Sequence, residues 1–347
     1  MQKKTPNIGQ VISLALLSLP YLLYISFLIR SGKQPVDYGT FMDIGQHMLD
    51  GVDIYEANSY YPMPFVFVFA FFSWLPRWLS ITLWFLWPVV AALAISGWSP
   101  YTLLFAPLFG HFVGAQSSVF GMLGLWGYRR NRQMDSAAGG VWLALTLIKP
   151  QLGLVPLVWA GIQWGKSLWE TRRIPRQLWA FLAAMGVFYL PGFALVPDWP
   201  TKWLSVPRPL FQRALSGMLP RSLYLLMTPQ TALYWVLLIV LALGLLYLLW
   251  RLNDRRLPFD QAVLWSFIAS PLYHDYDLVQ VIALLDTPRL RKAAALLSIP
   301  GWLVILTAYN NDARWIVFTL IAPGLLYMFL WRDRHALPSE AEARAAI

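Results

Sequence analysis

Residues 231–250 read TALYWVLLIVLALGLLYLLW and contain no charged side chain. A helix needs about 20 consecutive apolar residues to cross the hydrocarbon core of a bilayer, and this stretch meets that length. Residues 8–29 form a second uncharged run. That run is too long for a signal peptide and lacks a small-residue cleavage site, so we expect a retained first helix. The two runs predict a membrane protein.

The composition supports this class throughout the chain. Of 347 residues, 58% are hydrophobic and 13% are charged, and the mean hydropathy is +0.52. We expect one all-α integral membrane domain over residues 1–347, a polytopic bundle of about ten to twelve transmembrane helices. The expected membrane segments are 8–29, 61–76, 79–97, 101–128, 138–148, 151–165, 177–196, 231–250, 259–273, 276–287, 293–309 and 314–331.

Two pairs of these segments, 138–165 and 259–287, are too short for two full crossings, and basic residues flank both pairs. They indicate hairpins of short or broken helices. Irregular backbone at membrane depth is tolerated where it lines a cavity inside the protein.

The distribution of charge predicts the orientation. With a cytoplasmic N-terminus and alternating segments, most of the 27 Lys and Arg residues lie in the cytoplasm, as the positive-inside rule requires. We therefore expect a multi-pass protein of the cell membrane with both termini cytoplasmic and two large outer loops, 31–60 and 197–230. The basic residues placed outside are Arg30, Lys33, Lys202, Arg208, Arg213, Arg221 and Arg314.

Charge and cysteine content also exclude some partners and sites. The net charge is +10, but its asymmetry favours membrane lipid over nucleic acid as the partner of the basic residues. No cysteine is present, so disulfides, thiolate metal sites and cysteine nucleophiles are excluded.

The first outer loop, 31–60, is the richest in carboxylates. Apolar residues recur at roughly helical spacing over 38–50, which predicts an amphipathic helix on the membrane surface. Asp37 precedes or caps that helix. One interpretation makes Asp37 an N-cap residue, and the other makes it a general base for a sugar hydroxyl. The acidic residues of the loop are Asp37, Asp43, Asp50, Asp53 and Glu56.

Lys149 stands beside Pro150 in an otherwise apolar segment, where a charge is costly. It either snorkels to the interface or binds the phosphate of a lipid-linked donor. In the second interpretation the ammonium has no protein partner, so methionine should replace it without strain.

A third group of polar residues surrounds a proline turn at 270–277, which contains His274 and Asp275. His274 either binds a phosphate or hydroxyl group or pairs locally with Asp277. Ligand spacing for a metal is not diagnostic here, and we expect no metal site.

Two further sets of polar residues remain. Gln116, which follows His111 in a glycine-containing segment, needs a hydrogen-bond partner that is either substrate or a neighbouring helix. Arg208 and Arg213 lie near tryptophans, which suits sugar stacking and phosphate binding, although solvated loop arginines are commoner. Because the chain has no glycine-rich phosphate loop, an activated donor should arrive through the membrane.

Four stretches, in this order, resemble the GT-C glycosyltransferases, in particular glycosyltransferase family 87. The first runs from Asp37-Tyr38-Gly39 through Gly51-Val52-Asp53-Ile54-Tyr55 to Tyr61-Pro62-Met63-Pro64; the others are Gly114-Ala115-Gln116-Ser117, Leu147-Ile148-Lys149-Pro150 and Ser270-Pro271-Leu272-Tyr273-His274. They extend over most of the chain. One departure is that Gly-Ala-Gln stands where the family has a direct Gly-Gln pair.

The resemblance implies a GT-C-like bundle and a polyprenyl-phosphate-dependent hexosyltransferase, most simply a mannosyltransferase. Asp37 would be the catalytic base on the outer face, and transfer to a glycan or glycolipid hydroxyl would invert the anomeric centre. The expected reaction needs no cofactor, and a divalent metal is optional. The alternative class is a transporter or lipid flippase with Lys149 in its pathway, and a scaffold subunit is a third. The residues expected to bind substrate are Lys149, His274, Gln116, Asp43, Tyr61, Asp275, Arg208 and Arg213.

Overall fold

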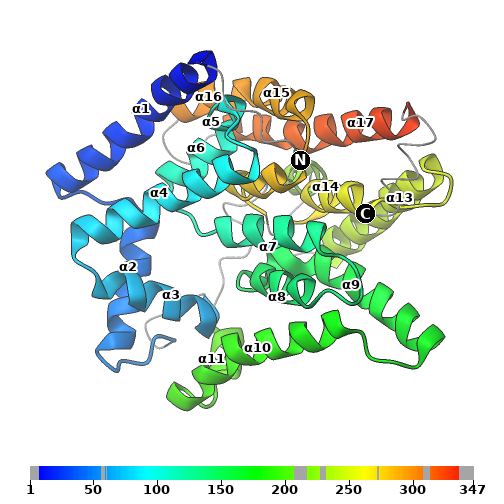
Figure 1. The fold of residues 1–347 in the computed structure, drawn as a ribbon, viewed down its shortest axis with the longest axis horizontal. Helices are drawn as coiled ribbons and strands as arrows, with labels where there is room; N and C mark the ends of the chain where they lie inside the picture. The colour runs from blue at the N-terminus through cyan, green and yellow to red at the C-terminus, as the bar shows by residue number, and fades with distance from the viewer. Residues whose placement is uncertain are drawn as a thin grey trace.

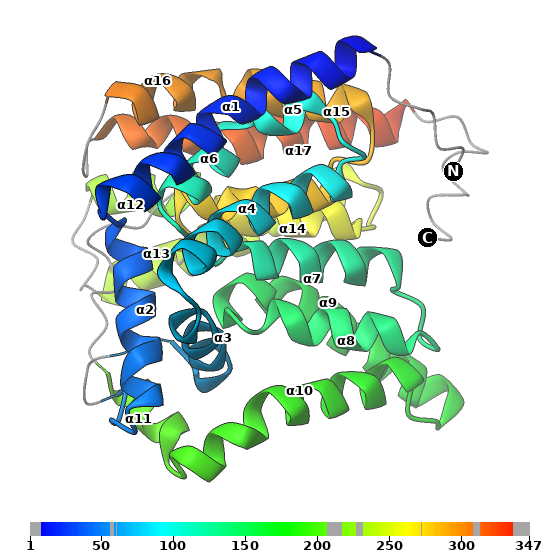
Figure 2. The ribbon, with the colours of Figure 1, turned by 60° about the vertical axis from the view of Figure 1, so that its left-hand side comes forward.

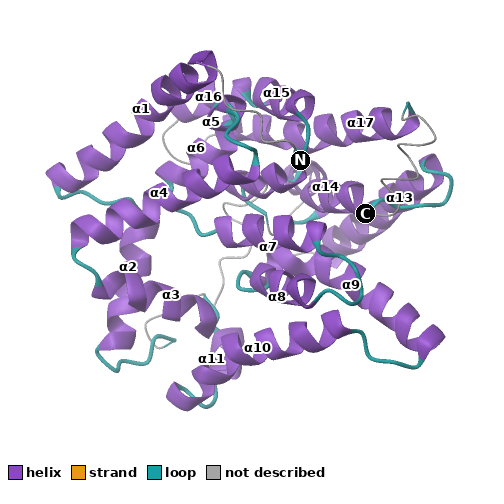
Figure 3. Ribbon diagram, viewed as in Figure 1, coloured by secondary structure: helices purple, strands orange, loops and turns teal. Residues whose placement is uncertain are grey.

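The computed structural model describes residues 8–55, 59, 61–206, 217–226, 232–271, 273–307 and 313–335. Within these ranges the chain is helical and has no strand (Figure 3). The helices are α1 (Ile8–Ser31), α2 (Val36–Leu49), α3 (Met63–Trp74), α4 (Arg77–Ile95), α5 (Pro100–Leu103), α6 (Ala106–Val113), α7 (Val119–Arg130), α8 (Ala137–Thr146), α9 (Pro150–Thr171), α10 (Arg176–Leu195), α11 (Trp199–Ser205), α12 (Met218–Leu226), α13 (Ala232–Leu252), α14 (Phe259–Ala269), η1 (Asp275–Leu284), α15 (Pro288–Leu297), α16 (Ile299–Thr307), η2 (Ala313–Leu320) and α17 (Ile321–Arg334).

The described residues contain fewer full-length membrane helices than the sequence predicts. Five helices are long and apolar enough to cross a membrane, and a sixth is possible if α15 and α16, bent by 41° relative to each other, count as one. The chain is thus a polytopic helical membrane protein. The expected ten to twelve transmembrane helices, which include short and broken ones, stay a prediction. The 12-residue helix α3 is about 18 Å long at 1.5 Å per residue, shorter than the hydrocarbon core of about 30 Å.

Three long-range hydrogen bonds fix the relative direction of α1 and α4. Gln10, near the start of α1, donates to the carbonyl of Trp98, just after α4, at 3.0 Å. At the other end, the Arg77 guanidinium donates to the carbonyls of Gly32 and Lys33. The two helices are therefore antiparallel, and Arg77 lies on the same side as the loop after α1. The expectation that residues 61–76 cross the membrane and carry Arg77 to the opposite side is wrong.

This correction makes a prediction for cysteine labelling, which is clean because the chain has no native cysteine. Single cysteines at Ser31 and Trp78 should react with a membrane-impermeant maleimide from one side of the membrane. A cysteine at Trp98 should react only from the other side, because α4 separates the two tryptophans. Labelling of Trp78→Cys and Ser31→Cys from opposite sides would restore the crossing at 61–76.

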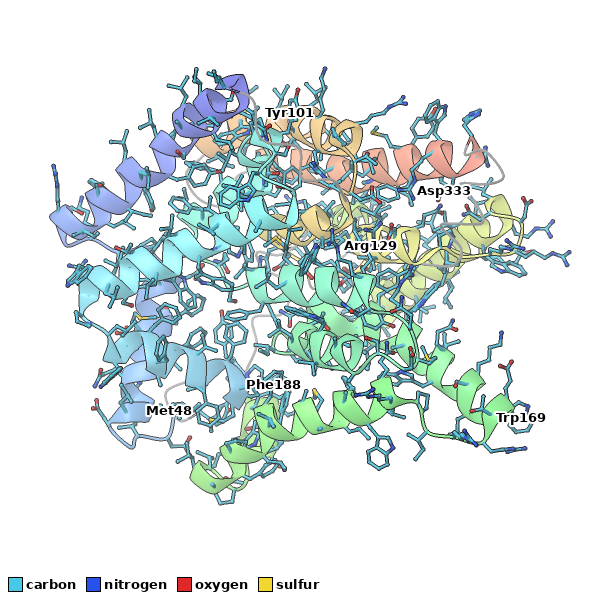
Figure 4. The ribbon with its side chains drawn as sticks, viewed as in Figure 1. Met48, Tyr101, Arg129, Trp169, Phe188 and Asp333 are labelled. Atoms are coloured by element: carbon cyan, nitrogen blue, oxygen red, sulfur yellow. The ribbon has the colours of Figure 1, made fainter. Side chains whose placement is uncertain are left out.

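The pair α14 and η1 forms a hairpin. Arg129, labelled in Figure 4, binds Asp260 in the first turn of α14 through two N–H groups at 2.7 and 2.6 Å. It also binds Asp286, which follows η1, at 3.1 Å. One arginine thus joins the two ends of the hairpin formed by α14 and η1. This matches the hairpin that the sequence predicts over 259–287.

The pair α8 and α9 forms a second hairpin. At its open end, Gln177 of α10 binds the carbonyls of Asn131 and Gln133 before α8 and accepts from the indole of Trp164 in α9. At its tip, the Tyr189 hydroxyl donates to the Leu147 carbonyl at 2.7 Å. From residue 177 to 189, α10 rises about 18 Å. The tip therefore lies deep inside the bundle.

A third hairpin, α6 and α7, replaces the single crossing that the sequence predicts over 101–128. η1 packs against both α6 and α7. The chain reverses between them at residues 114–118, where Ala115 takes a φ of 54°. α5, where the 101–128 segment begins, packs against α15. α15 begins two residues after Asp286, the partner of Arg129, and Arg129 itself lies at the end of α7. The segment therefore begins and ends on the same side of the bundle.

Helix α2 stands crosswise to the long helices. In Figure 2, α4, α7 and α10 run in nearly the same direction, and α2 lies across one end of them. α1 and α10 lie at opposite edges of the bundle (Figure 1). α2 packs closely on α3, with the rings of Phe41 and Phe69 stacked at 4.5 Å. A Cβ atom at Gly45 would lie 2.5 Å from the Phe69 backbone, so glycine permits this close approach.

Candidate functional site

The tips of the three hairpins meet at one buried cluster of polar side chains. The Lys149 ammonium, at the start of α9, lies 2.8 Å from Asp277 Oδ1 in η1 and 3.2 Å from the Ser118 hydroxyl before α7. Ser118 and Asp277 also form a short hydrogen bond with each other. Lys149 therefore has a carboxylate partner, and the expectation that its ammonium is unpaired is wrong.

Local backbone geometry holds Asp277 in this cluster. Its second carboxylate oxygen accepts from the backbone N–H of His274 at 2.9 Å, while its own N–H donates to the His274 carbonyl. Asp277 is fully buried. A carboxylate at such a place is stable only when hydrogen bonds and an opposite charge replace its water shell.

Asp37 reaches the same region from α2. The Gln116 side-chain amide donates a short hydrogen bond to Asp37 Oδ2 and a second bond to the Gly114 carbonyl at 3.1 Å. α2 begins at Val36 after Pro35, and no side chain caps it. The interpretation of Asp37 as an N-cap residue is therefore wrong. Its half-buried carboxylate points instead to the turn between α6 and α7.

Two tyrosines belong to the surroundings of Asp37 and the buried ion pair. The Tyr61 ring lies 5.2 Å from the ring of Phe41, which follows Asp37 by one turn of α2. Burial, and after it the carboxylates of Asp37 and Asp277, raise the pKa of the Tyr61 phenol. The Lys149 ammonium lies 5.2 Å from the centre of the Tyr276 ring. Tyr276 also stacks on His274 at 4.8 Å. Both phenols stay protonated at neutral pH and can donate hydrogen bonds.

Asp275 lies on the side of the cluster that faces α6. A Cβ atom at Gly110 would be 3.9 Å from its Oδ2. Burial raises the Asp275 pKa to about 7, yet part of the side chain stays accessible. Burial also lowers the His274 pKa. At neutral pH, Asp275 is partly protonated and His274 is neutral.

Other residues expected from the sequence lie elsewhere. Asp43 is exposed on α2, and no hydrogen bond or ion pair joins it to the cluster. Six residues of helix rotate a side chain by about 600°, which puts Asp43 on a different face from Asp37. Arg208 and Arg213 lie outside the described residues.

Sequence reasoning missed the roles of three residues. Asp277 and Ser118 are the partners of Lys149. His111 Nε2 accepts from the backbone N–H of Val119 at 3.2 Å, and its Nδ1 is buried without a hydrogen-bond partner among the described residues. Burial lowers the His111 pKa to about 3, so the imidazole is neutral. A signal for Asp277 existed, because a lysine in an apolar segment needs a carboxylate partner.

The cluster combines a half-exposed carboxylate, neutral hydrogen-bond donors and one buried cation. Asp37 can accept a proton from a hydroxyl group within hydrogen-bond reach. Lys149, Tyr61, Tyr276 and His274 can donate to an anionic oxygen. In the described part of the chain, no three His, Asp or Glu side chains are grouped so as to hold a metal ion.

Comparisons with family models, with curated proteins and with solved structures find no match to this chain.

Proposed function

We propose that this protein transfers a hexose from a polyprenyl-phosphate carrier to a hydroxyl group of a glycan or glycolipid, with Asp37 as the base. The observation that carries the proposal is the position of Asp37. Its half-buried carboxylate is held by Gln116 beside the three hairpin tips, at the end of the bundle that α2 covers (Figure 2). From this position the Asp37 carboxylate can act on an acceptor next to the sugar of the donor, while the polyprenyl tail of the donor stays in lipid.

The donor phosphate is assigned to the hairpin tips. The Lys149 ammonium has three N–H groups, of which Asp277 and Ser118 bind two. We assign the third to a phosphate oxygen, together with the neutral imidazole of His274. Charge-assisted hydrogen bonds of this kind are stronger than neutral ones, and they offset the charge that develops as the phosphate leaves.

The proposed reaction is a single displacement. Asp37 removes the proton of the acceptor hydroxyl, and the oxygen attacks the anomeric carbon from the face opposite the phosphate. The bond from that carbon to the phosphate oxygen breaks, and its electron pair stays with the phosphate. The anomeric centre is inverted. The identification of the sugar as mannose rests on the resemblance of the four sequence stretches to family 87.

The orientation belongs to the same proposal. Basic residues gather at the ends of helices opposite α2, including Arg129 and Arg332, which both contact Asp286. The positive-inside rule then puts that end and the two termini in the cytoplasm. α2 and Asp37 would lie on the outer face, where acceptor glycans are assembled.

One observation favours a second candidate, a transporter. A buried ion pair between Lys149 and Asp277, held by three hairpins, resembles the intramembrane charges that mark substrate pathways. A transporter would move a solute across sealed vesicles without changing it. A transferase would leave a new glycosidic bond.

The test is to incubate the purified protein in nanodiscs with polyprenyl-phosphate mannose or glucose and a membrane extract, and to identify products by mass spectrometry. The expected result is an acceptor heavier by one hexose and loss of the donor. Solute uptake by vesicles with no glycosylated product would favour the transporter.

A further inference from the structure

A pocket of about 230 Å³ lies between the turn that follows α2 and the link from α10 to α11. It has the volume of about eight water molecules. Apolar side chains form most of the wall and a few charged groups stand among them, a pattern typical of ligand sites. The lining residues are Met48, Gly51, Val52, Asp53, Ile54, Met63, Leu195, Val196, Pro197, Asp198 and Lys202. Met48 is labelled near the end of α2 in Figure 4.

The charged groups of this pocket form one connected set. The Lys202 ammonium lies 2.6 Å from Asp53 and 3.4 Å from Asp198. It therefore joins the turn after α2 to α11, although Asp53 and Lys202 are 149 positions apart in the sequence. Two carboxylates and an ammonium at one pocket offer both acceptors and donors.

A buried donor with no hydrogen-bond partner among the described residues lies behind the wall of the pocket. The Trp199 indole is 3% exposed, and its Nε1 has no hydrogen-bond partner among the described residues. It lies against Gly192, where a Cβ atom would be 3.0 Å from Nε1 and 2.6 Å from Met63. Met63 lines the pocket, so this N–H sits in the layer directly behind it. The N–H is thus an unsatisfied polar group next to the pocket and not part of its lining.

The pocket is connected to the candidate site through α2 and α3. Met48 follows Asp37 by 11 positions, about 16 Å along a helix axis. Met63 is two positions from Tyr61, whose ring lies 5.2 Å from that of Phe41, one helical turn after Asp37. A ligand that reaches both Asp37 and the pocket must therefore be longer than one sugar residue.

We propose that this pocket binds sugar residues of the acceptor that lie beyond the reacting hydroxyl, so that the acceptor is an oligosaccharide or carries one. The proposal rests on the proposed function. Carboxylates accept from the hydroxyl groups of a sugar ring, an ammonium donates to its oxygens, and Met48, Val52 and Ile54 pack on its apolar face. The acceptor would be selected by its length.

Direct binding tests the pocket without requiring activity. Linear mannose oligosaccharides of one and four residues are titrated onto the protein in nanodiscs, and affinity is measured by ligand-observed NMR. Val52→Trp fills the pocket from an exposed turn, and Asp198→Asn removes one carboxylate while keeping its size. We expect the four-residue ligand to bind more tightly than the single residue. Both variants should weaken it about tenfold or more. Asp198→Asn loses one charge-assisted hydrogen bond, and Val52→Trp occupies the space of the sugar.

The matched control is Asp135→Asn, an exposed carboxylate outside the pocket lining, which should bind both ligands as the unmodified protein does. Equal affinity for the two ligands, or unchanged binding in Val52→Trp and Asp198→Asn, would overturn the pocket assignment.

The transfer assay separates this inference from the proposed function. For each acceptor, kcat/KM is measured, and the value for a four-residue acceptor is divided by the value for a one-residue acceptor. If the pocket inference and the proposed function both hold, this ratio falls about tenfold in Val52→Trp and Asp198→Asn. Transfer with an unchanged ratio would refute the pocket and leave the function standing. Oligosaccharide binding that the pocket variants weaken, in a protein that forms no glycosidic bond, would refute the function and leave the pocket standing.

Discussion

Asp37→Asn should lower hexose transfer by about 10²–10⁴-fold at saturating donor, the usual contribution of a general base, while the protein keeps its fold. Asparagine has nearly the size of aspartate and can still accept a hydrogen bond from Gln116, so α2 should stay in place. Only the ability to take a proton is removed. The measurements are the transfer rate and the thermal midpoint of the same preparation.

Asp43→Asn is the matched control, because it changes the same functional group on the same helix but on an exposed face. It should transfer at nearly the unmodified rate. If Asp37→Asn stays active while Asp43→Asn loses activity, the base is Asp43. If both stay active, the proposed displacement mechanism is wrong.

Lys149→Met should lower the free energy of unfolding by about 3–5 kcal/mol, because it leaves the buried Asp277 carboxylate without its cation. This result is opposite to what an unpaired lysine predicts, and the difference comes from the 2.8 Å contact with Asp277. The measurement is reversible unfolding in mixed detergent micelles, followed by far-UV circular dichroism.

The double variant Lys149→Met with Asp277→Leu should recover most of that stability, because apolar side chains of similar volume often replace a buried ion pair without loss. It also separates the two roles of Lys149. A stable double variant that no longer binds polyprenyl-phosphate mannose supports the assignment of the ammonium to the donor phosphate. If Lys149→Met has the same free energy of unfolding as the unmodified protein, the ion pair between Lys149 and Asp277 does not stabilise the fold.

The membrane class and two of the three hairpins could be predicted from the sequence. A long apolar run indicates a helix that crosses the bilayer, and two short adjacent runs indicate a hairpin. Which apolar segments form full-length helices could not be predicted. Hydropathy does not distinguish a helix facing lipid from one packed inside the protein, and α3 buries Phe65, Val66 and Phe69 against its neighbours. The chain reversal at Ala115, between α6 and α7, could not be predicted, because alanine rarely adopts a left-handed φ and nothing in the sequence marks it.

The sequence also predicted most of the residues of the candidate site. It did not predict which of them form hydrogen bonds or ion pairs with one another. Asp37 and Gln116 were identified separately, yet their hydrogen bond joins positions 79 apart. Asp277 was seen beside His274, and its pairing with Lys149 depends on how two hairpins dock. Asp43 was expected at the site because it is a carboxylate in the same loop. Its position on α2, six residues after Asp37, puts it on another face of the helix.

The ion pair at the hairpin tips also has a consequence for biosynthesis. Lys149 and Asp277 are 128 positions apart, so at about 5–20 residues per second a ribosome adds the carboxylate about 6–26 s after the lysine. During that interval the first two hairpins carry a cation whose partner has not yet been made. The nascent chain must therefore keep the Lys149 ammonium in contact with water or a chaperone until the α14–η1 hairpin arrives with Asp277.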